Sequence, residues 1–304
     1  MKTVEAVSRI ALKNILFATD FSPCSNAALP YALSIARRYG AKFYAAHVLP
    51  PEANMLFMSP ESWPALAAEE EGRARKEVQY LEERLQGIPH SVLMREGKVW
   101  EVLAQLIEEQ DIDLLVVGTH GRTGIRKLLM GSIAEEIFRR AHCPVLTVGP
   151  NVLDNPEDLA EFHQILFATD FSEDSLAAAP YAISLAQEHQ AQLSLLHVLE
   201  RPEVGTVDLE ANAAFLLHRL KELVPPEAEL CCHAKYFVEF GSPADQILEF
   251  AKNRRADLII LGVRRPKRKL GASTHLVKTT VHNVVAYARC PVLMVVGEHR
   301  SKDP

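Results

Sequence analysis

One stretch of the sequence, Val117 to Ser132, combines glycines, hydroxyls and positive charges at a spacing suited to phosphate. Glycines let backbone N–H groups approach an anion closely, and a helix starting after the last glycine would add its free N–H groups and positive dipole end. The candidate ligand contacts are Gly118, Thr119, His120, Gly121, Arg122, Gly131 and Ser132. We interpret the stretch as a phosphate-binding loop, although it is neither a Walker A motif nor a dinucleotide fingerprint. A plain glycine-rich turn is the alternative.

A second candidate is the acid in Thr19-Asp20-Phe21-Ser22, which follows the apolar run Ile15–Ala18. A carboxylate there could accept hydrogen bonds from a ribose hydroxyl or an adenine amino group. It could equally cap the helix that follows, a role worth ~1 kcal/mol. Asp170 repeats the feature, and a structural cap would be repeated too, so both interpretations stay open.

The sequence contains an internal repeat that divides the chain into two similar halves. Residues 14–49 and 164–199 align without a gap, and more than half of the aligned positions are identical, including the unbroken ILFATDFS. Each half also ends in a similar segment, AHCPVLTV at 141–148 and ARCPVLMV at 288–295. The sequence therefore predicts two domains, 1–150 and 151–304, joined by a linker at 150–161 that is rich in acids and proline.

Strand and helix patterns alternate within each half, which predicts an α/β fold with a mainly parallel sheet and helices on both faces. In the first half we expect a helix capped by Ser22 or Ser25, with Pro30 near its first turn. The other expected elements are strands at 15–18, 42–49, 91–95, 113–117 and 144–148 and helices at 61–85, 99–109 and 132–141. Ligands of such sheets bind beyond the carboxyl ends of the strands, where both candidate loops lie.

Composition narrows the class of protein. The 304 residues carry a net charge of −6, which argues against a broad nucleic-acid surface. No apolar run reaches the ~20 residues of a membrane helix, the first residues lack a secretory pattern, and five cysteines do not make a disulfide framework. We expect a cytoplasmic protein that does not contact membranes.

Taken together, ILFATDFS, the HVL strand end, the Gly118-x2-Gly121-x9-Gly131-Ser132 spacing and CPVLTV resemble the universal stress protein (UspA) family over nearly the whole chain. The resemblance implies two doubly wound five-stranded domains of the adenine-nucleotide alpha hydrolase-like type, and ATP as ligand. Asp20 would contact the adenosine, the Val48 backbone the adenine, and the glycines with Ser132 the ribose and phosphates; Thr19 belongs to the same site. Because the family dimerises through its last strand, we expect an intramolecular pseudo-dimer that pairs 144–148 with 291–295. A further homodimer stays open.

The second half departs from this pattern. Arg265 stands where the first half has Gly121, and Lys278-Thr279 stand where it has Gly131-Ser132. A lysine side chain there would crowd the backbone approach that a glycine allows. Asp170, Val198 and Gly262 remain, so we expect a degenerate second site that keeps an adenosine-like pocket, and ATP mainly in the first half.

The sequence favours an ATP-binding regulatory protein of the stress response over two alternatives. One is a scaffold that binds no nucleotide but an unidentified protein partner. The other is a slow ATPase with Mg²⁺ held near Asp20, although no catalytic motif is present and we assign no catalytic residue. No metal site is assigned, since Cys231-Cys232-His233 lacks zinc-site spacing. We expect His47 and His197 to be core histidines, Cys143 and Cys290 to be packing residues, and the basic run 264–269 to be a solvated loop.

Overall fold

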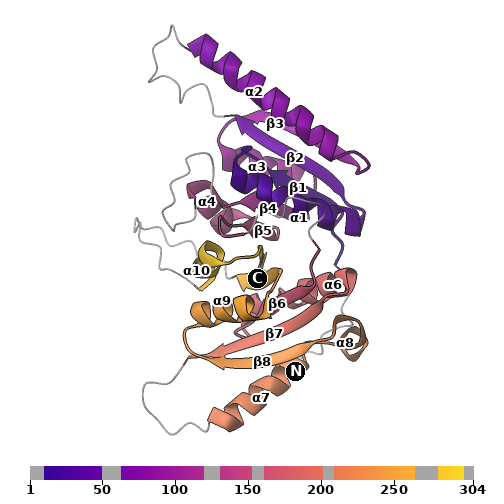
Figure 1. Cartoon of the computed structure of the whole chain (residues 1–304), viewed down its shortest axis with the longest axis vertical. Coiled ribbons are helices and arrows are strands. Elements are labelled where there is room, and N and C mark those ends of the chain that lie inside the picture. The colour runs from indigo at the N-terminus through magenta and orange to yellow at the C-terminus, as the bar shows by residue number, and fades with distance from the viewer. Residues whose placement is uncertain are drawn as a thin grey trace, which may run out of the picture.

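The computed structural model describes residues 10–49, 63–119, 131–152, 161–200, 209–263 and 280–297. They form one ten-stranded sheet in the order β3-β2-β1-β4-β5-β10-β9-β6-β7-β8 (Figure 1). The strands of the first half are β1 (Asn14–Ala18), β2 (Lys42–Leu49), β3 (His90–Glu96), β4 (Leu114–Gly118) and β5 (Val145–Val148). Those of the second are β6 (Gln164–Ala168), β7 (Gln192–Leu199), β8 (Lys235–Phe240), β9 (Leu258–Val263) and β10 (Val292–Val296). Within each half the pairing is parallel.

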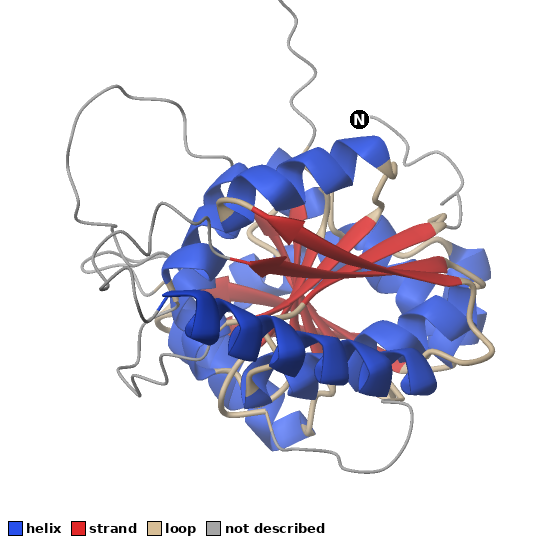
Figure 2. Ribbon diagram, turned by 90° about the horizontal axis from the view of Figure 1, so that it is seen from above, coloured by secondary structure: helices blue, strands red, loops and turns tan. Residues whose placement is uncertain are grey.

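Helices cover both faces of the sheet (Figure 2). The first half has α1 (Pro23–Tyr39), α2 (Trp63–Arg84), α3 (Val99–Glu109) and α4 (Ser132–Arg140). The second half has α5 (Glu173–Leu176), α6 (Ala179–His189), α7 (Leu209–Lys221), α8 (Pro226–Cys232), α9 (Pro243–Arg254) and α10 (Thr280–Tyr287). Side chains of α1 and α6 pack in one core layer, and those of α3, α4, α9 and α10 pack in the other. The predicted α/β fold with both faces covered is confirmed.

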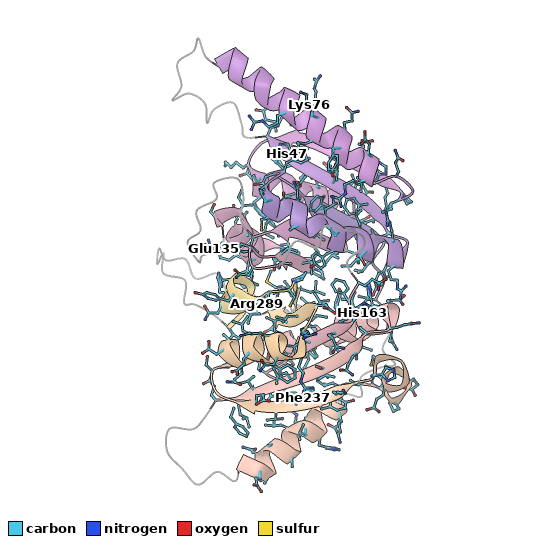
Figure 3. The ribbon with its side chains drawn as sticks, viewed as in Figure 1. His47, Lys76, Glu135, His163, Phe237 and Arg289 are labelled. Carbon is cyan, nitrogen blue, oxygen red and sulfur yellow. The ribbon has the colours of Figure 1, made fainter. Side chains whose placement is uncertain are left out.

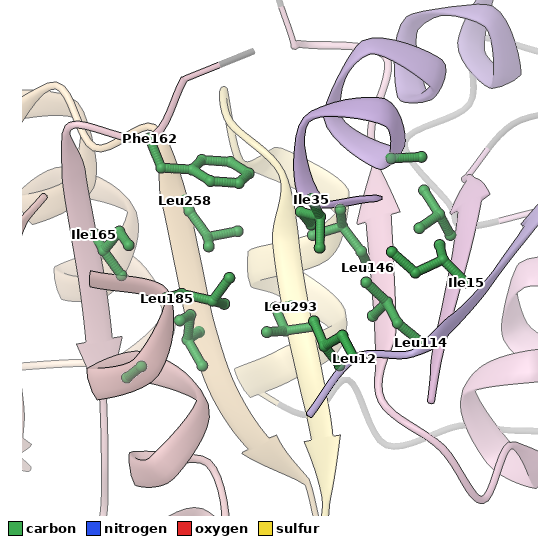
Figure 4. Close-up of a cluster of buried hydrophobic side chains, with 14 of the residues drawn as sticks. Leu12, Ile15, Ile35, Leu114, Leu146, Phe162, Ile165, Leu185, Leu258 and Leu293 are labelled. Atoms are coloured by element: carbon green, nitrogen blue, oxygen red, sulfur yellow. The ribbon is translucent and has the colours of Figure 1, made fainter. Parts of the chain in front are cut away.

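Each central strand is buried on both faces, which explains its unbroken apolar run. In β1, Ile15 and Phe17 belong to the α1 layer, whereas Leu16 between them belongs to the α3 layer. The α1 layer continues from the first half into the second, where Leu293 follows Leu146 (Figure 4). The two halves therefore share one hydrophobic core on each side of the sheet.

The two halves meet where β5 and β10 pair antiparallel, with Leu146 opposite Leu293. The Thr147 hydroxyl adds a hydrogen bond to the Val292 carbonyl at 3.1 Å. This is the pairing of last strands that the sequence predicts, so the chain is an intramolecular pseudo-dimer. We call this junction the seam.

Polar and aromatic side chains strengthen the seam on the α1 and α6 side. The Tyr31 ring stacks against Phe162 with ring centroids 6.1 Å apart. The His189 ring meets the same phenylalanine edge-on at 4.9 Å. The Tyr39 and Ser184 hydroxyls lie 3.3 Å apart, within hydrogen-bond distance.

Acidification is expected to destabilise the protein through His189. Its Nε2 atom is buried and has no hydrogen-bond partner among the described residues. Burial, together with the nearby Arg38 and His163, lowers the pKa of His189 from 6.5 to about 4. Between pH 6.5 and pH 4, His189 therefore binds a proton in the unfolded chain but not in the folded chain. The free energy of unfolding is highest above pH 6.5 and falls progressively toward pH 4.

Urea unfolding midpoints measured at several pH values across this window check the prediction. His189→Phe, which keeps a ring against Phe162 but cannot titrate, should show a smaller loss of stability on acidification. His218→Gln, a change at an exposed histidine of α7, serves as the control and should keep the wild-type slope. An unchanged slope in His189→Phe would assign the acid sensitivity to other groups.

Helix α1 differs from expectation in the place of its proline. The N-cap is Ser22, one of the two predicted candidates, and Pro23 occupies the first turn. Pro30 therefore lies inside the helix, and the prediction that it sits near the first turn is wrong. In the second half the equivalent Pro180 falls in the first turn of α6, because α5 ends at Leu176 and a new helix begins at Ala179.

Candidate functional site

The turn after β1 is held by its own side chains. The Thr19 hydroxyl accepts a hydrogen bond from the Phe21 N–H at 2.9 Å and lies 3.1 Å from the Ser25 hydroxyl. The Asp20 carboxylate accepts from the Ser22 N–H at 3.0 Å, which forms an Asx turn. Asp20 is half-buried at the carboxyl end of β1. The helix cap is Ser22, so the alternative in which Asp20 caps α1 does not hold.

The glycine-rich stretch begins and ends next to this turn. The Thr119 carbonyl, directly after β4, accepts a hydrogen bond from the Gly131 N–H at 2.9 Å. Gly131 is the N-cap of α4, and Ser132 is the first and exposed residue of that helix. At Gly118 a Cβ atom would lie 2.8 Å from the Ser25 nitrogen, so only glycine lets β4 approach α1 this closely. Thr119 and Gly131, the described residues on either side of 120–130, are thereby joined at the carboxyl edge of the sheet.

The second half repeats the turn almost atom for atom. The Thr169 hydroxyl accepts from the Phe171 N–H at 3.0 Å, and the Asp170 carboxylate accepts from the Ser172 N–H at 2.9 Å and from its hydroxyl at 2.6 Å. Burial raises the pKa of the Asp170 carboxyl, but hydrogen bonds from Ser172 and Ser175 outweigh it, and the net pKa lies below its usual value. Asp170 is therefore a fixed anionic acceptor at neutral pH.

A cavity of about 370 Å³ opens beside Asp170. It lies between the carboxyl ends of β6, β7 and β9 and the amino-terminal ends of α9 and α10. This is where the strand order reverses, the usual ligand position in such sheets. Its walls are mostly apolar, with a few polar groups, as in small-molecule sites. The lining residues are Ala168, Thr169, Asp170, Ser175, Leu196, Val198, Glu200, Pro243, Ile247, Leu261, Gly262, Thr280 and Val281.

The structure brings most of the predicted site residues to one edge of the sheet. Asp170, Val198 and Gly262, the residues predicted for a second site, line the same cavity. In the first half Asp20, Val48 and Gly118 lie at the ends of neighbouring strands, and Gly131 is bonded to the end of β4. Thr19 and Thr119 are buried and support the backbone there. The predicted contacts His120, Gly121 and Arg122 lie outside the described residues.

The burial expected for two histidines and two cysteines is confirmed. His47 and His197 are buried, and each lies behind one of the two turns (Figure 3 labels His47 on β2). Cys143 and Cys290 are buried, and burial raises the pKa of both thiols.

Among the described side chains, His, Cys, Asp and Glu do not form groups of three that could hold a metal ion. No described helix is long and apolar enough to cross a bilayer.

Ten residues of the cavity wall were not predicted from the sequence, among them Glu200, Pro243, Ile247, Thr280 and Val281. Glu200 directly follows β7, so the rule of strand ends could have found it. The other four of these five come from the amino-terminal turns of α9 and α10. The sequence pattern that would place these helix residues in the wall is weaker, because their position depends on how closely each helix packs against the sheet.

Comparison with known proteins agrees with this architecture. The family model of the universal stress proteins matches residues 11–149 and 161–296. A universal stress protein of Methanocaldococcus jannaschii is 34% identical over 139 residues, covering 45% of this chain and 81% of the relative. Universal stress protein YxiE of Bacillus subtilis is 32% identical over 149 residues, covering 44% of this chain and 99% of the relative.

A solved structure matches the whole arrangement rather than one half. The universal stress protein of Archaeoglobus fulgidus superposes with a TM-score of 0.69 and 19% identity, covering 95% of this chain and 100% of that one. At this identity the match supports the fold alone. Since the family model matches both halves and relatives align at more than 30% identity, the chain belongs to the universal stress protein family.

Proposed function

We propose that this chain is an ATP-binding regulatory protein of the stress response, with the nucleotide held in the first half. The hydrogen bond between the Gly131 N–H and the Thr119 carbonyl carries the proposal. It brings the start of α4 to the end of β4, beside the turn that holds Asp20. Free N–H groups at a helix start and a carboxylate at a strand end suit the two ends of a nucleotide, its phosphates and its ribose.

The described walls differ in side-chain size between the two halves. Leu196, Leu261 and Val281 correspond to the smaller Ala46, Val117 and Ala134, whereas Thr280 corresponds to the larger Ile133. The assignment of ATP to the first half therefore rests on the start of α4 and not on the size of these walls.

The second cavity fits the unphosphorylated part of such a ligand. Asp170 offers a carboxylate for hydroxyl groups, and Val198 with its apolar neighbours offers a wall for a base. Lys278 takes the place of the glycine that begins the phosphate-binding helix in the first half. We therefore assign ATP to the first half and only an adenosine-like ligand to the second.

Freshly purified protein, denatured and analysed by mass spectrometry, tests the assignment through the identity and molar ratio of released nucleotide. About one ATP per chain is expected, and titration calorimetry of the emptied protein with ATP and Mg²⁺ should reach the same ratio. Adenosine added to the ATP-saturated protein should give a second, weaker binding event.

Two results would contradict the proposal in different ways. Two ATP molecules per chain would show that Lys278 does not close the second site to phosphates. If no nucleotide is released and ATP gives no binding heat, the result would favour the alternative in which the fused pseudo-dimer is a protein scaffold.

A further inference from the structure

A buried histidine stands behind the turn that carries Asp20. His47, near the end of β2, places its Nδ1 atom 2.8 Å from the Thr19 carbonyl oxygen. Because a carbonyl only accepts, Nδ1 must carry the proton of this hydrogen bond. The side chain is 5% exposed. The contact therefore fixes both the tautomer of His47 and the direction of the peptide group that joins Thr19 to Asp20.

The same ring also holds the residue on the other side of Asp20. The Phe21 ring packs against the His47 ring with centroids 4.6 Å apart and planes inclined by 39°. Phe21 has a φ of 58°, in the left-handed region that costs a bulky residue about 1–3 kcal/mol. Such a conformation persists only where its surroundings enforce it, and His47 is one of the groups that do so.

Asp20 thus lies between two residues that both contact one ring. Its carboxylate is oriented further by the Ser22 N–H. We infer that His47 is a positioning residue: it sets the direction of the Asp20 carboxylate and thereby the affinity of the first half for ATP. The inference rests on the proposed function, because ATP affinity is its readout.

The second half contains the same assembly and so provides a matched control. His197 lies 2.8 Å from the Thr169 carbonyl oxygen, and its ring centroid lies 4.8 Å from that of Phe171, whose φ is 60°. There the Arg219 guanidinium lies over the Phe171 ring at 4.1 Å as further support. A substitution of His197 makes a similar change in packing without touching the first half.

Calorimetric titration with ATP and Mg²⁺ of His47→Phe and His197→Phe separates positioning from packing. Phenylalanine keeps a ring but loses the Nδ1 donor. We expect His47→Phe to raise the Kd of the tight ATP site about tenfold. His197→Phe should leave that Kd unchanged. Thermal unfolding midpoints report the structural cost of each variant.

A double-mutant cycle with Asp20→Asn asks whether His47 acts through Asp20. If it does, His47→Phe adds no further loss of affinity once the carboxylate has been removed. His47→Asn supplies a second route should the phenylalanine variant fail to fold. Its side-chain amide N–H can still donate to the Thr19 carbonyl, so most of the affinity should be retained.

Equal Kd values for His47→Phe and His197→Phe would overturn the inference, as would a loss of affinity that is the same with and without the Asp20 carboxylate. Wild-type protein that binds no ATP would remove the proposed function itself, and the two failures are therefore distinguishable. A selective loss in His47→Phe that vanishes in the Asp20→Asn background supports the inference.

Discussion

Replacing Gly262 by alanine is expected to lower the free energy of unfolding by about 3 kcal/mol, at the upper end of overpacking effects. A Cβ atom at this position of β9 would lie 2.3 Å from both the Asp174 carbonyl oxygen and the Ser175 Cα atom. Both are backbone atoms of α5, so rotating a side chain cannot relieve the clash. The helix must move away from the strand, and the turn that holds Asp170 moves with it.

Urea unfolding of a set of glycine variants checks this prediction. Gly118→Ala meets the Ser25 nitrogen at 2.8 Å and should destabilise less than Gly262→Ala. Gly72→Ala, in α2, meets nothing within 4 Å and should raise stability by up to about 1 kcal/mol, because alanine favours a helix more than glycine does. If Gly262→Ala is as stable as wild type, the close approach of α5 to β9 is wrong.

The second large effect concerns binding rather than stability. Gly131→Lys copies the residue of the second half onto the start of α4. The backbone there has a φ of −60°, which any residue adopts, so the protein should still fold. A lysine side chain would occupy the space that phosphates need next to the helix N–H groups. We expect ATP to bind roughly 100-fold more weakly, a loss of about 2.7 kcal/mol.

Two variants control for charge and for size. Gln105→Lys adds the same positive charge on the exposed face of α3, beside Glu109, and should leave ATP binding unchanged. Gly131→Ala adds only a methyl group and should fall between wild type and Gly131→Lys. If calorimetry shows that Gly131→Lys binds ATP as tightly as wild type, the start of α4 does not belong to the ATP site.

The sequence predicted the strands and several helices closely because their burial leaves a regular pattern. Strands covered on both faces need continuous apolar residues, and β2 begins and ends as expected at Lys42 and Leu49. Helix α3 also matches its expected bounds, since its apolar residues recur at helical spacing. Pro30 was misplaced because Ser22 caps the helix and Pro23 begins it, so Pro30 lies about two turns beyond the helix start.

The candidate site could be predicted only in part. Strand ends are visible in the sequence, so Asp170, Val198 and Gly262 could be placed together before the cavity was seen. Helix residues such as Ile247 and Val281 enter the same wall through packing distances that no local pattern encodes. The link from His47 to the Thr19 carbonyl likewise joins residues from different strands, and the sequence indicates only a buried histidine.

The antiparallel pairing of β5 with β10 inside one polypeptide has a consequence for how the protein can change over generations. When two identical chains pair in this way, one gene encodes both halves of the pair, and every substitution appears in both. Here each half has its own codons, so position 278 can hold a lysine while the matching position 131 holds a glycine. The covalent link also holds the two halves at a high effective concentration, so the pairing of β5 with β10 does not depend on how much protein the cell makes.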